Sequence, residues 1–250
     1  MGKIIFLLTF LISFIGFGQN QIDSKGRKQG PWSKTYPKSK VYEYKGQFKD
    51  NKPVGTFTYF YPSTKVKAVI KHDENSTRSL AYFYHENSNL MSAGIYRDMK
   101  KDSVWMNFLP SGRLSTTETF KNDLLHGKKT IYFVPEDVND KSRFISGTFN
   151  YENGKLKGEA VEYFDTGVTR SKGSYEMDKK VGVWDYFHPN GKKMIMERYK
   201  NGIRHGWQFA YDETGKEVGK SYYYYGQLKE GKDLEHIMKQ MKAKGINPNG

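Results

Sequence analysis

The chain has 250 residues, with 41 basic and 27 acidic side chains and a formal net charge of +14 at pH 7. It contains no cysteine, which excludes a fold stapled by disulfides and a lipid anchor on cysteine. Aromatic residues make up 16% of the chain, and its 25 glycines favour short strands joined by tight turns over long helices. We therefore expect an all-β protein.

Residues 1–19 have the layout of a secretory signal peptide. Lys3 precedes an apolar run over residues 4–17, and small residues stand at Gly16 and Gly18, near the end of the run. The run is shorter than the roughly 20 residues that a membrane span needs. We expect cleavage near Gly18 or Gln19 and export to the periplasm, the cell surface or the medium. Retention of the segment as an anchor is the alternative.

A spacing pattern recurs about every 24 residues through most of the remaining chain. The residue five places after each unit start is aromatic in seven of eight units. The residue seven places before the next start is also aromatic in seven of eight, with Gly231 counted as a degenerate ninth start. One longer interval indicates an insertion over residues 134–143. The eight unit starts are Gly30, Gly55, Arg78, Ser103, Gly127, Gly158, Gly182 and Gly206.

Each unit is typical of a β-hairpin, with a strand of about seven residues that often opens with Gly-x-aromatic, a turn, a second strand and another turn. An isolated hairpin is barely stable in water, so the units must stack edge to edge. We predict an elongated antiparallel sheet of about eight stacked hairpins over residues 20–232. Glycines beside the turns are expected at positive φ. These glycines are Gly154, Gly191, Gly202 and Gly215.

Residues 233–250 form the predicted C-terminal helix and tail. Asp233 is a plausible N-cap and Gly245 follows the expected end of the helix. Apolar residues recur at helical spacing, which favours a short amphipathic helix that caps the last hairpin. A partner-binding helix is the alternative. The apolar positions are Leu234, Ile237, Met238 and Met241.

The signature Y-x-N-G-x-x-x-G, followed by an aromatic residue and a further glycine, occurs at 151–167 and 199–215. It resembles the MORN repeat in its bacterial variant form, the repeat of the YwqK-like antitoxin family. The resemblance covers residues 30–231, although the stretch HDENSTRS in the third unit lacks the motif. The family implies an antiparallel hairpin array with a role in protein assembly or membrane association. An export signal does not fit a cytoplasmic antitoxin.

Several first strands end in two adjacent aromatic residues, as at Phe60 and Tyr61. Because neighbouring side chains of a strand point to opposite faces, both faces of the sheet are expected to be partly apolar. One face can stack rings between hairpins, and the other can be offered to a ligand. We predict a binding surface that includes Tyr61, Tyr84 and Phe164.

The sequence gives no pattern typical of a catalytic or metal site. His126 and His205 occupy the same place in their units, which indicates a shared turn or packing role rather than metal binding. Glu136, Asp137 and Asp140 lie in the insertion without the spacing of a calcium loop, and are expected to form a solvated acidic loop. No G-x-S-x-G frame is present. We expect no catalytic residue, no cofactor and no metal.

Lysines are scattered along the turns, whereas aromatic residues recur in register. We therefore expect a non-catalytic, exported repeat protein that acts as a protein-interaction or scaffold module through an aromatic and basic sheet surface. A protein partner is expected, an envelope glycan or an anionic membrane surface stays open, and nucleic acid is not expected. The alternatives are a carbohydrate or cell-wall binding module, because aromatic hairpin repeats can stack on sugars, and an antitoxin-like inhibitor of a toxin.

Overall fold

The computed structural model describes residues 19–134 and 144–249. These residues form one long antiparallel sheet of 19 strands that is not closed, followed by a single helix, which confirms the all-β prediction. The strands are β1 (Gln21–Ile22), β2 (Lys28–Thr35), β3 (Tyr42–Lys49), β4 (Lys52–Phe60), β5 (Val66–His72), β6 (Arg78–Tyr84), β7 (Leu90–Arg97), β8 (Lys100–Phe108), β9 (Leu114–Lys121), β10 (Leu124–Tyr132), β11 (Ile145–Glu152), β12 (Lys155–Tyr163), β13 (Thr169–Glu176), β14 (Lys179–Phe187), β15 (Lys193–Lys200), β16 (Ile203–Arg204), β17 (Gly206–Tyr211), β18 (Glu217–Tyr224) and β19 (Gln227–Lys229), and the helix is α1 (Gly231–Ala243).

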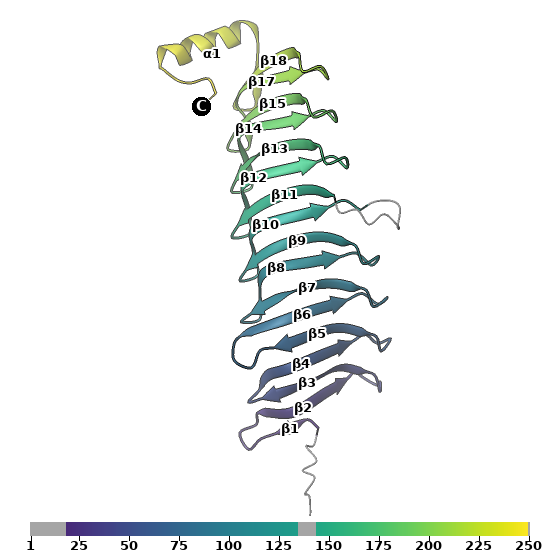
Figure 1. The fold of residues 1–250 in the computed structure, drawn as a ribbon. Helices are drawn as coiled ribbons and strands as arrows, with labels where there is room; N and C mark the ends of the chain where they lie inside the picture. Colours follow the sequence, from purple (N-terminus) through teal and green to yellow (C-terminus); the bar gives the residue numbers. More distant parts are fainter. Residues whose placement is uncertain (1–18, 135–143, 250) are drawn as a thin grey trace, which may run out of the picture.

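The strands lie in the sheet in chain order and form eight stacked hairpins, as predicted. The hairpins run from β2–β3 to the last one, in which β16 and β17 together form the first strand and β18 the second. Figure 1 shows a single-layered stack, with the turns inside the hairpins along its right edge and the links between hairpins along its left edge.

Two-residue turns connect most successive hairpins. Both residues of each turn have positive φ, the conformation of a type I′ turn, whose twist matches that of antiparallel strands. Gly154 and Gly202 supply the second residue of two such turns, and Gly191 and Gly215 also have positive φ, so this prediction is confirmed. The turns between hairpins lie at 50–51, 98–99, 122–123, 153–154, 177–178 and 201–202, and a turn of the same kind at 225–226 joins β18 to β19.

Most unit starts lie inside a strand rather than at its beginning, which corrects the predicted boundaries. Gly55 is the fourth residue of β4 and Gly182 the fourth of β14. Gly55 has a φ of +64° where the pairing of β4 with β3 shifts by two residues. This is a β-bulge, which adds twist to the sheet and needs a residue that tolerates positive φ. Ser103 takes a φ of +59° at the same place in the fourth unit.

The third unit starts at Ser79, and the predicted start at Arg78 is wrong by one residue. Ser79 pairs with Tyr96 as Gly55 pairs with His72. The error arises because β5 and β6 pair without a register shift and are joined by a longer turn over residues 73–77. The predicted aromatic row therefore includes His72, where the sequence count placed Lys71.

The core is a thin layer on one face of the sheet, because a single-layered sheet buries few side chains completely. Three rings in it are almost fully buried: Phe57, Trp105 and Trp184 are 2%, 1% and 3% exposed. Each lies on a glycine of the preceding strand, and a Cβ atom on that glycine would overlap the ring. These glycines are Gly46, Gly94 and Gly173.

Helix α1 and the tail cover the opposite face of the last hairpin, as predicted for a capping helix. Tyr222 is fully buried there, and its hydroxyl donates to the carbonyl oxygen of Pro248 at 3.0 Å and contacts the sulfur of Met241 at 3.4 Å. Met241 is the buried member of the predicted apolar positions. The N-cap is Glu230, so Asp233 lies in the first turn and the predicted N-cap is wrong.

At the first end of the sheet, Asn20 lies against the outer edge of β2. Its side-chain amide donates to the carbonyl oxygen of Ser33 at 3.0 Å, and its Oδ1 accepts from the Ser33 N–H at 2.8 Å.

The predicted signal peptide lies almost wholly outside the described residues. Within residues 19–134 and 144–249, no helix is long and apolar enough to cross a membrane.

Candidate interaction surface

One face of the sheet, called the ring face here, carries a row of eight rings, one from each hairpin. Each ring pairs across the hairpin with the unit start, so the glycine or serine opposite leaves room for it. All eight are half-buried and recur about every 9.6 Å, twice the strand spacing. The rings belong to Phe48, His72, Tyr96, Phe120, Tyr151, Tyr175, Tyr199 and Tyr223.

Beside this row lies a second row in which large and small residues alternate between neighbouring hairpins. In three places a ring covers a glycine, as Trp184 covers Gly173. Between β11 and β12 the sizes are reversed, because Phe149 pairs with Ala160. Between β9 and β10 an ion pair replaces them, with the Lys129 ammonium 2.8 Å from the Glu118 carboxylate. The same position is thus filled in each case by a complementary pair.

Lysine side chains lie over rings at three places along the ring face. The Lys28 ammonium is 4.7 Å from the centroid of the Trp32 ring and 4.8 Å from that of Phe48. Lys101 lies 4.5 Å from the Trp105 ring, and Lys180 lies 4.2 Å from the Trp184 ring. Ammonium groups over aromatic faces gain a cation–π attraction. The face is therefore aromatic and basic at once.

Shallow grooves mark the ring face over the first to fourth hairpins. One groove is lined by Phe83, Tyr96, Lys101 and Trp105, and a second groove shares Phe83. A hydrogen-bonded chain of side chains borders the first groove. Ser92 Oγ donates to Asn107 Oδ1 at 2.8 Å, and Asn107 Nδ2 donates to Thr116 Oγ1 at 2.9 Å and to Glu118 Oε2 at 3.2 Å.

A buried carboxylate lies on the ring face of the seventh hairpin. Glu197 is 6% exposed and accepts a 2.5 Å hydrogen bond from the Tyr199 hydroxyl on one oxygen. Its other oxygen is 2.9 Å from the Arg204 guanidinium. Burial and then the hydrogen bond to Glu197 raise the pKa of Tyr199 to about 12. Both oxygens of Glu197 are engaged, which is the arrangement of a structural carboxylate.

The three predicted binding residues lie along the edge of the within-hairpin turns. Tyr61 is the first residue of its turn, and Phe164 occupies the same place in the sixth hairpin. Tyr84 is the last residue of strand β6, so it does not occupy the same position as Tyr61 and Phe164. Its neighbour His85 is the first residue of the turn and does occupy that position. All three are half-buried. That they bind a partner stays a prediction.

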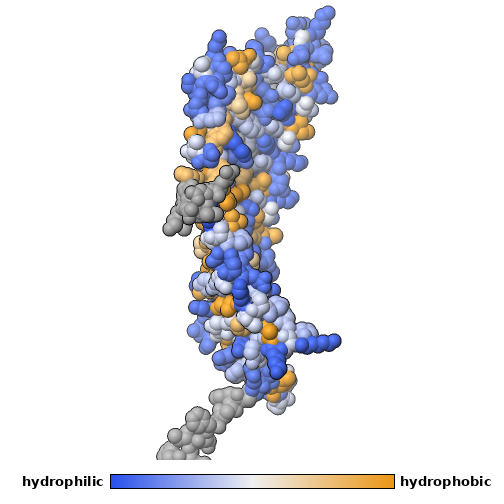
Figure 2. All heavy atoms as spheres, turned by 90° about the vertical axis from the view of Figure 1, so that its right-hand side faces the viewer, coloured by the Kyte–Doolittle hydropathy of each residue, from blue (hydrophilic) through white to orange (hydrophobic). Residues whose placement is uncertain are grey.

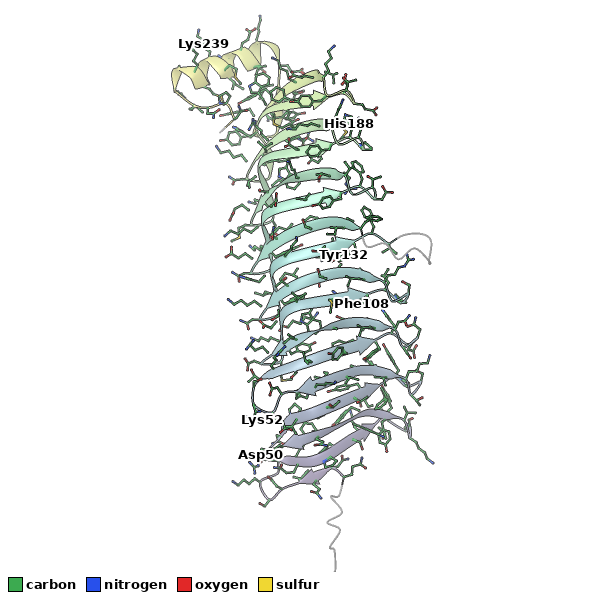
Figure 3. All side chains as sticks on the ribbon, viewed as in Figure 1. Asp50, Lys52, Phe108, Tyr132, His188 and Lys239 are labelled. Carbon is green, nitrogen blue, oxygen red and sulfur yellow. The ribbon has the colours of Figure 1, made fainter. Side chains whose placement is uncertain are left out.

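The tyrosines and histidines at the first turn position form a ladder along this edge. The Tyr61 hydroxyl donates to the Tyr84 carbonyl oxygen at 2.7 Å, and Tyr36 makes the same bond to Phe60 at 2.6 Å. His188 Nε2 donates to the carbonyl oxygen of Tyr211 at 3.0 Å. Figure 3 shows His188 at this edge, with Asp50 and Lys52 at the other. Figure 2 faces the ladder edge and shows apolar and hydrophilic side chains interspersed along it.

His126 and His205 share one structural role, as predicted. Nδ1 of His126 accepts from the backbone N–H of Asn153 at 3.4 Å, and Nδ1 of His205 accepts from that of Tyr225 at 3.3 Å. Each histidine thus contacts the first residue of a two-residue turn. In the part of the chain that the structure describes, no three histidine or acidic residues group as metal ligands would. The acidic insertion with Glu136, Asp137 and Asp140 lies outside that part.

No family model matches the chain, and no curated protein matches it. Among solved structures, it is similar to a chain of the Glycosylation Associate Protein (Gap123) complex from Streptococcus agalactiae, with 14% sequence identity and a TM-score of 0.25. The match covers 66% of this chain and 24% of that chain, so this chain spans about a quarter of the other's length. A likeness of this size does not establish a shared fold.

Proposed function

We propose that this protein is a non-catalytic scaffold that binds a protein partner through the ring face. The row of eight half-buried rings is the observation that supports this proposal most directly. In a single-layered sheet no second layer covers such a row, so the exposed part of each half-buried ring is available to a partner. Aromatic residues contribute strongly to protein interfaces because they bury a large area with few rotatable bonds.

The placement of charge supports a partner with both apolar and acidic groups over a uniform polyanion. Lys28, Lys101 and Lys180 lie over rings rather than in a continuous basic strip. Such a surface can pair with isolated carboxylates while the rings between them contact apolar side chains. We therefore propose a protein partner and not nucleic acid.

The engagement of the carboxylates supports binding rather than catalysis. Glu118 is in an ion pair with Lys129, and Glu197 is bonded to Tyr199 and Arg204. A general acid or base needs a carboxyl group that can reach a substrate. The carboxyl groups of Glu118 and Glu197 are held by their partners and do not meet this need.

We also propose that the chain is a MORN-variant repeat protein and that it is exported. The stack of eight hairpins supports the first proposal, and the layout of residues 1–19 supports the second.

A carbohydrate ligand is the second candidate, favoured by the groove over the third and fourth hairpins. This groove places the amide of Asn107 and the hydroxyl of Ser92 beside the rings of Phe83 and Tyr96. Sugars are typically bound by such a combination, with ring contacts on their apolar faces and hydrogen bonds to their hydroxyls.

The proposal is tested by affinity capture from an envelope extract at low and high salt, with two double variants compared. The ring-face variant is Phe83→Ala with Tyr96→Ala. The matched control changes the opposite face of the fourth hairpin, Val104→Ala with Met106→Ala, where the side chains are 52% and 41% exposed. Salt-resistant capture of one protein that only the ring-face variant loses supports the proposal. Capture of polyanions alone, lost at high salt, contradicts it, and capture of glycan favours the second candidate.

A further inference from the structure

A cavity of about 260 Å³, called the C-terminal pocket here, lies between the last hairpin and α1. Its wall on the side of the sheet consists of three rings, those of His205, Tyr224 and Tyr225. Ile237 and Met241 line it from α1. Figure 1 shows α1 above the last hairpin, extending past the left edge of the stack. The pocket is therefore far along the chain from the grooves of the ring face.

The three rings of the wall pack on one another. The centroid of the Tyr225 ring is 4.6 Å from that of His205 and 4.8 Å from that of Tyr224. His205 is only 4% exposed, and its Nδ1 accepts a hydrogen bond from the backbone N–H of Tyr225. These contacts hold the wall in place, so a ligand would pay little for ordering it.

Helix α1 and the tail are also tied to the last hairpin next to the pocket. The Tyr222 hydroxyl bonds to the Pro248 carbonyl oxygen and contacts Met241, as described above. In addition, the backbone N–H of Trp207 donates to Oδ1 of Asn249 at 3.1 Å. The side of the pocket formed by the helix is thus held by specific contacts with the sheet.

The charge of the pocket is positive. Lys200 and Lys244 line it, and none of the described residues that line it is acidic. Burial, and then the charge of Lys200, lower the pKa of His205, so this ring is neutral at pH 7 and the lysines supply the charge. A cationic ligand would be repelled here, whereas one negative group on a ligand would be attracted.

We propose that the C-terminal pocket binds a small amphipathic carboxylate, with an apolar ring system against the three-ring wall and its carboxylate beside Lys244. Ligand pockets are mostly apolar with a few placed polar groups, and they have volumes of about 300 to 1,000 Å³. A cavity just below this range suits a ligand of one or two rings. The site is independent of the proposed function, because no residue of the ring-face grooves contributes to it.

The probe is naphthoate, and naphthylmethanol is the matched neutral probe with the same ring system. We expect saturable binding of naphthoate to the full-length protein by isothermal titration calorimetry, and protection of the amides of residues 237–246 in hydrogen exchange. Naphthylmethanol should bind about tenfold more weakly, because it lacks the charged contact. This comparison uses the unchanged protein, so it does not depend on whether a variant folds.

Protein variants locate the site. Lys244→Glu should weaken naphthoate binding about tenfold, whereas Lys239→Glu makes the same charge change on the outer side of α1 and should leave binding nearly unchanged (Figure 3). Ile237→Trp fills the cavity and should weaken both probes. The scaffold variant Phe83→Ala with Tyr96→Ala should bind naphthoate normally, which separates this inference from the proposed function.

Four results would overturn the proposal. They are the absence of saturable binding, equal binding of the neutral probe, equal losses in Lys244→Glu and Lys239→Glu, and a loss of binding in the scaffold variant, which would place the probe on the ring face.

Discussion

The indole ring of Trp184 lies flat against the backbone of Gly173 on the neighbouring strand, with no space for a Cβ atom between them. The same relationship joins Trp105 to Gly94 and Phe57 to Gly46. Trp184 Nε1 also donates to the carbonyl oxygen of Ser174 at 3.1 Å, which fixes the ring in place. The glycine is therefore part of the packing between hairpins.

Gly173→Ala should destabilise the protein by about 1 to 3 kcal/mol, the usual cost of overpacking a filled core. Gly173 does not have positive φ, so the cost comes from overlap with Trp184 and not from the backbone. The matched control is Gly219→Ala, where the added methyl meets only ordinary contact and the change should stay within about 0.5 kcal/mol. Urea unfolding followed by circular dichroism measures both. Equal losses would show that the glycine does not hold the ring.

Tyr61→Phe removes one bond of the edge ladder while it keeps the ring. We expect a loss of about 0.5 to 1.5 kcal/mol, because the hydroxyl donates to the Tyr84 carbonyl oxygen in a half-buried place. Tyr84→Phe is the control, since its hydroxyl forms no hydrogen bond within residues 19–134 and 144–249. If both substitutions leave the urea midpoint unchanged, the ladder contributes nothing to stability.

Stability should fall as the pH rises from about 10 to about 12. In the folded protein, burial and the hydrogen bond to Glu197 raise the pKa of Tyr199 from 10.0 to about 12. Between these two pH values the unfolded chain loses the Tyr199 hydroxyl proton before the folded protein does. The stabilisation that this proton gives the folded state is therefore complete below pH 10 and is lost as the pH passes 12. Tyr199→Phe should flatten this part of the stability curve, measured as urea midpoints. Tyr225→Phe, which removes an exposed phenol, should leave the slope as it is; equal slopes in all three proteins would count against the assignment.

The period, the hairpins and the capping helix were predictable because they depend on local signals. Aromatic residues at fixed offsets mark the strands, and glycines such as Gly154 and Gly202 mark turns that require positive φ. The start of the third unit was predicted one residue too early, because β5 and β6 pair without a bulge and are joined by a longer turn. Only His72, the ring that pairs with Gly55, reveals the correct register.

The packing between hairpins was missed because it joins residues on different strands. Gly46, Gly94 and Gly173 each precede their ring by 11 residues, as the positions of Phe57, Trp105 and Trp184 show. This constant spacing is present in the sequence. It indicates a contact between the glycine and the ring only when the position of the bulge, which sets the register between neighbouring hairpins, is known. The equivalence of Tyr61 with His85, rather than with Tyr84, depends on the same register.

The native protein should begin at Gln19 or Asn20. Cleavage there keeps Asn20, whose backbone N–H donates to the carbonyl oxygen of Pro31 at 2.9 Å and whose side chain covers the edge of β2. Mass spectrometry of the protein purified from its own cells measures the first residue. A soluble cytoplasmic form that retains Met1 or Gly2 would refute the proposed export.

Photo-crosslinking from the two faces of the sheet tests the central claim most directly. A photoreactive amino acid is placed at Met91, which lines the groove of the ring face, and in a second protein at Met106, which is 41% exposed on the opposite face. We predict that one protein partner is crosslinked from position 91, at low and at high salt, and that position 106 gives no such product. Equal crosslinking from both faces, or a product only from position 106, would contradict the assignment of the ring face as the binding surface.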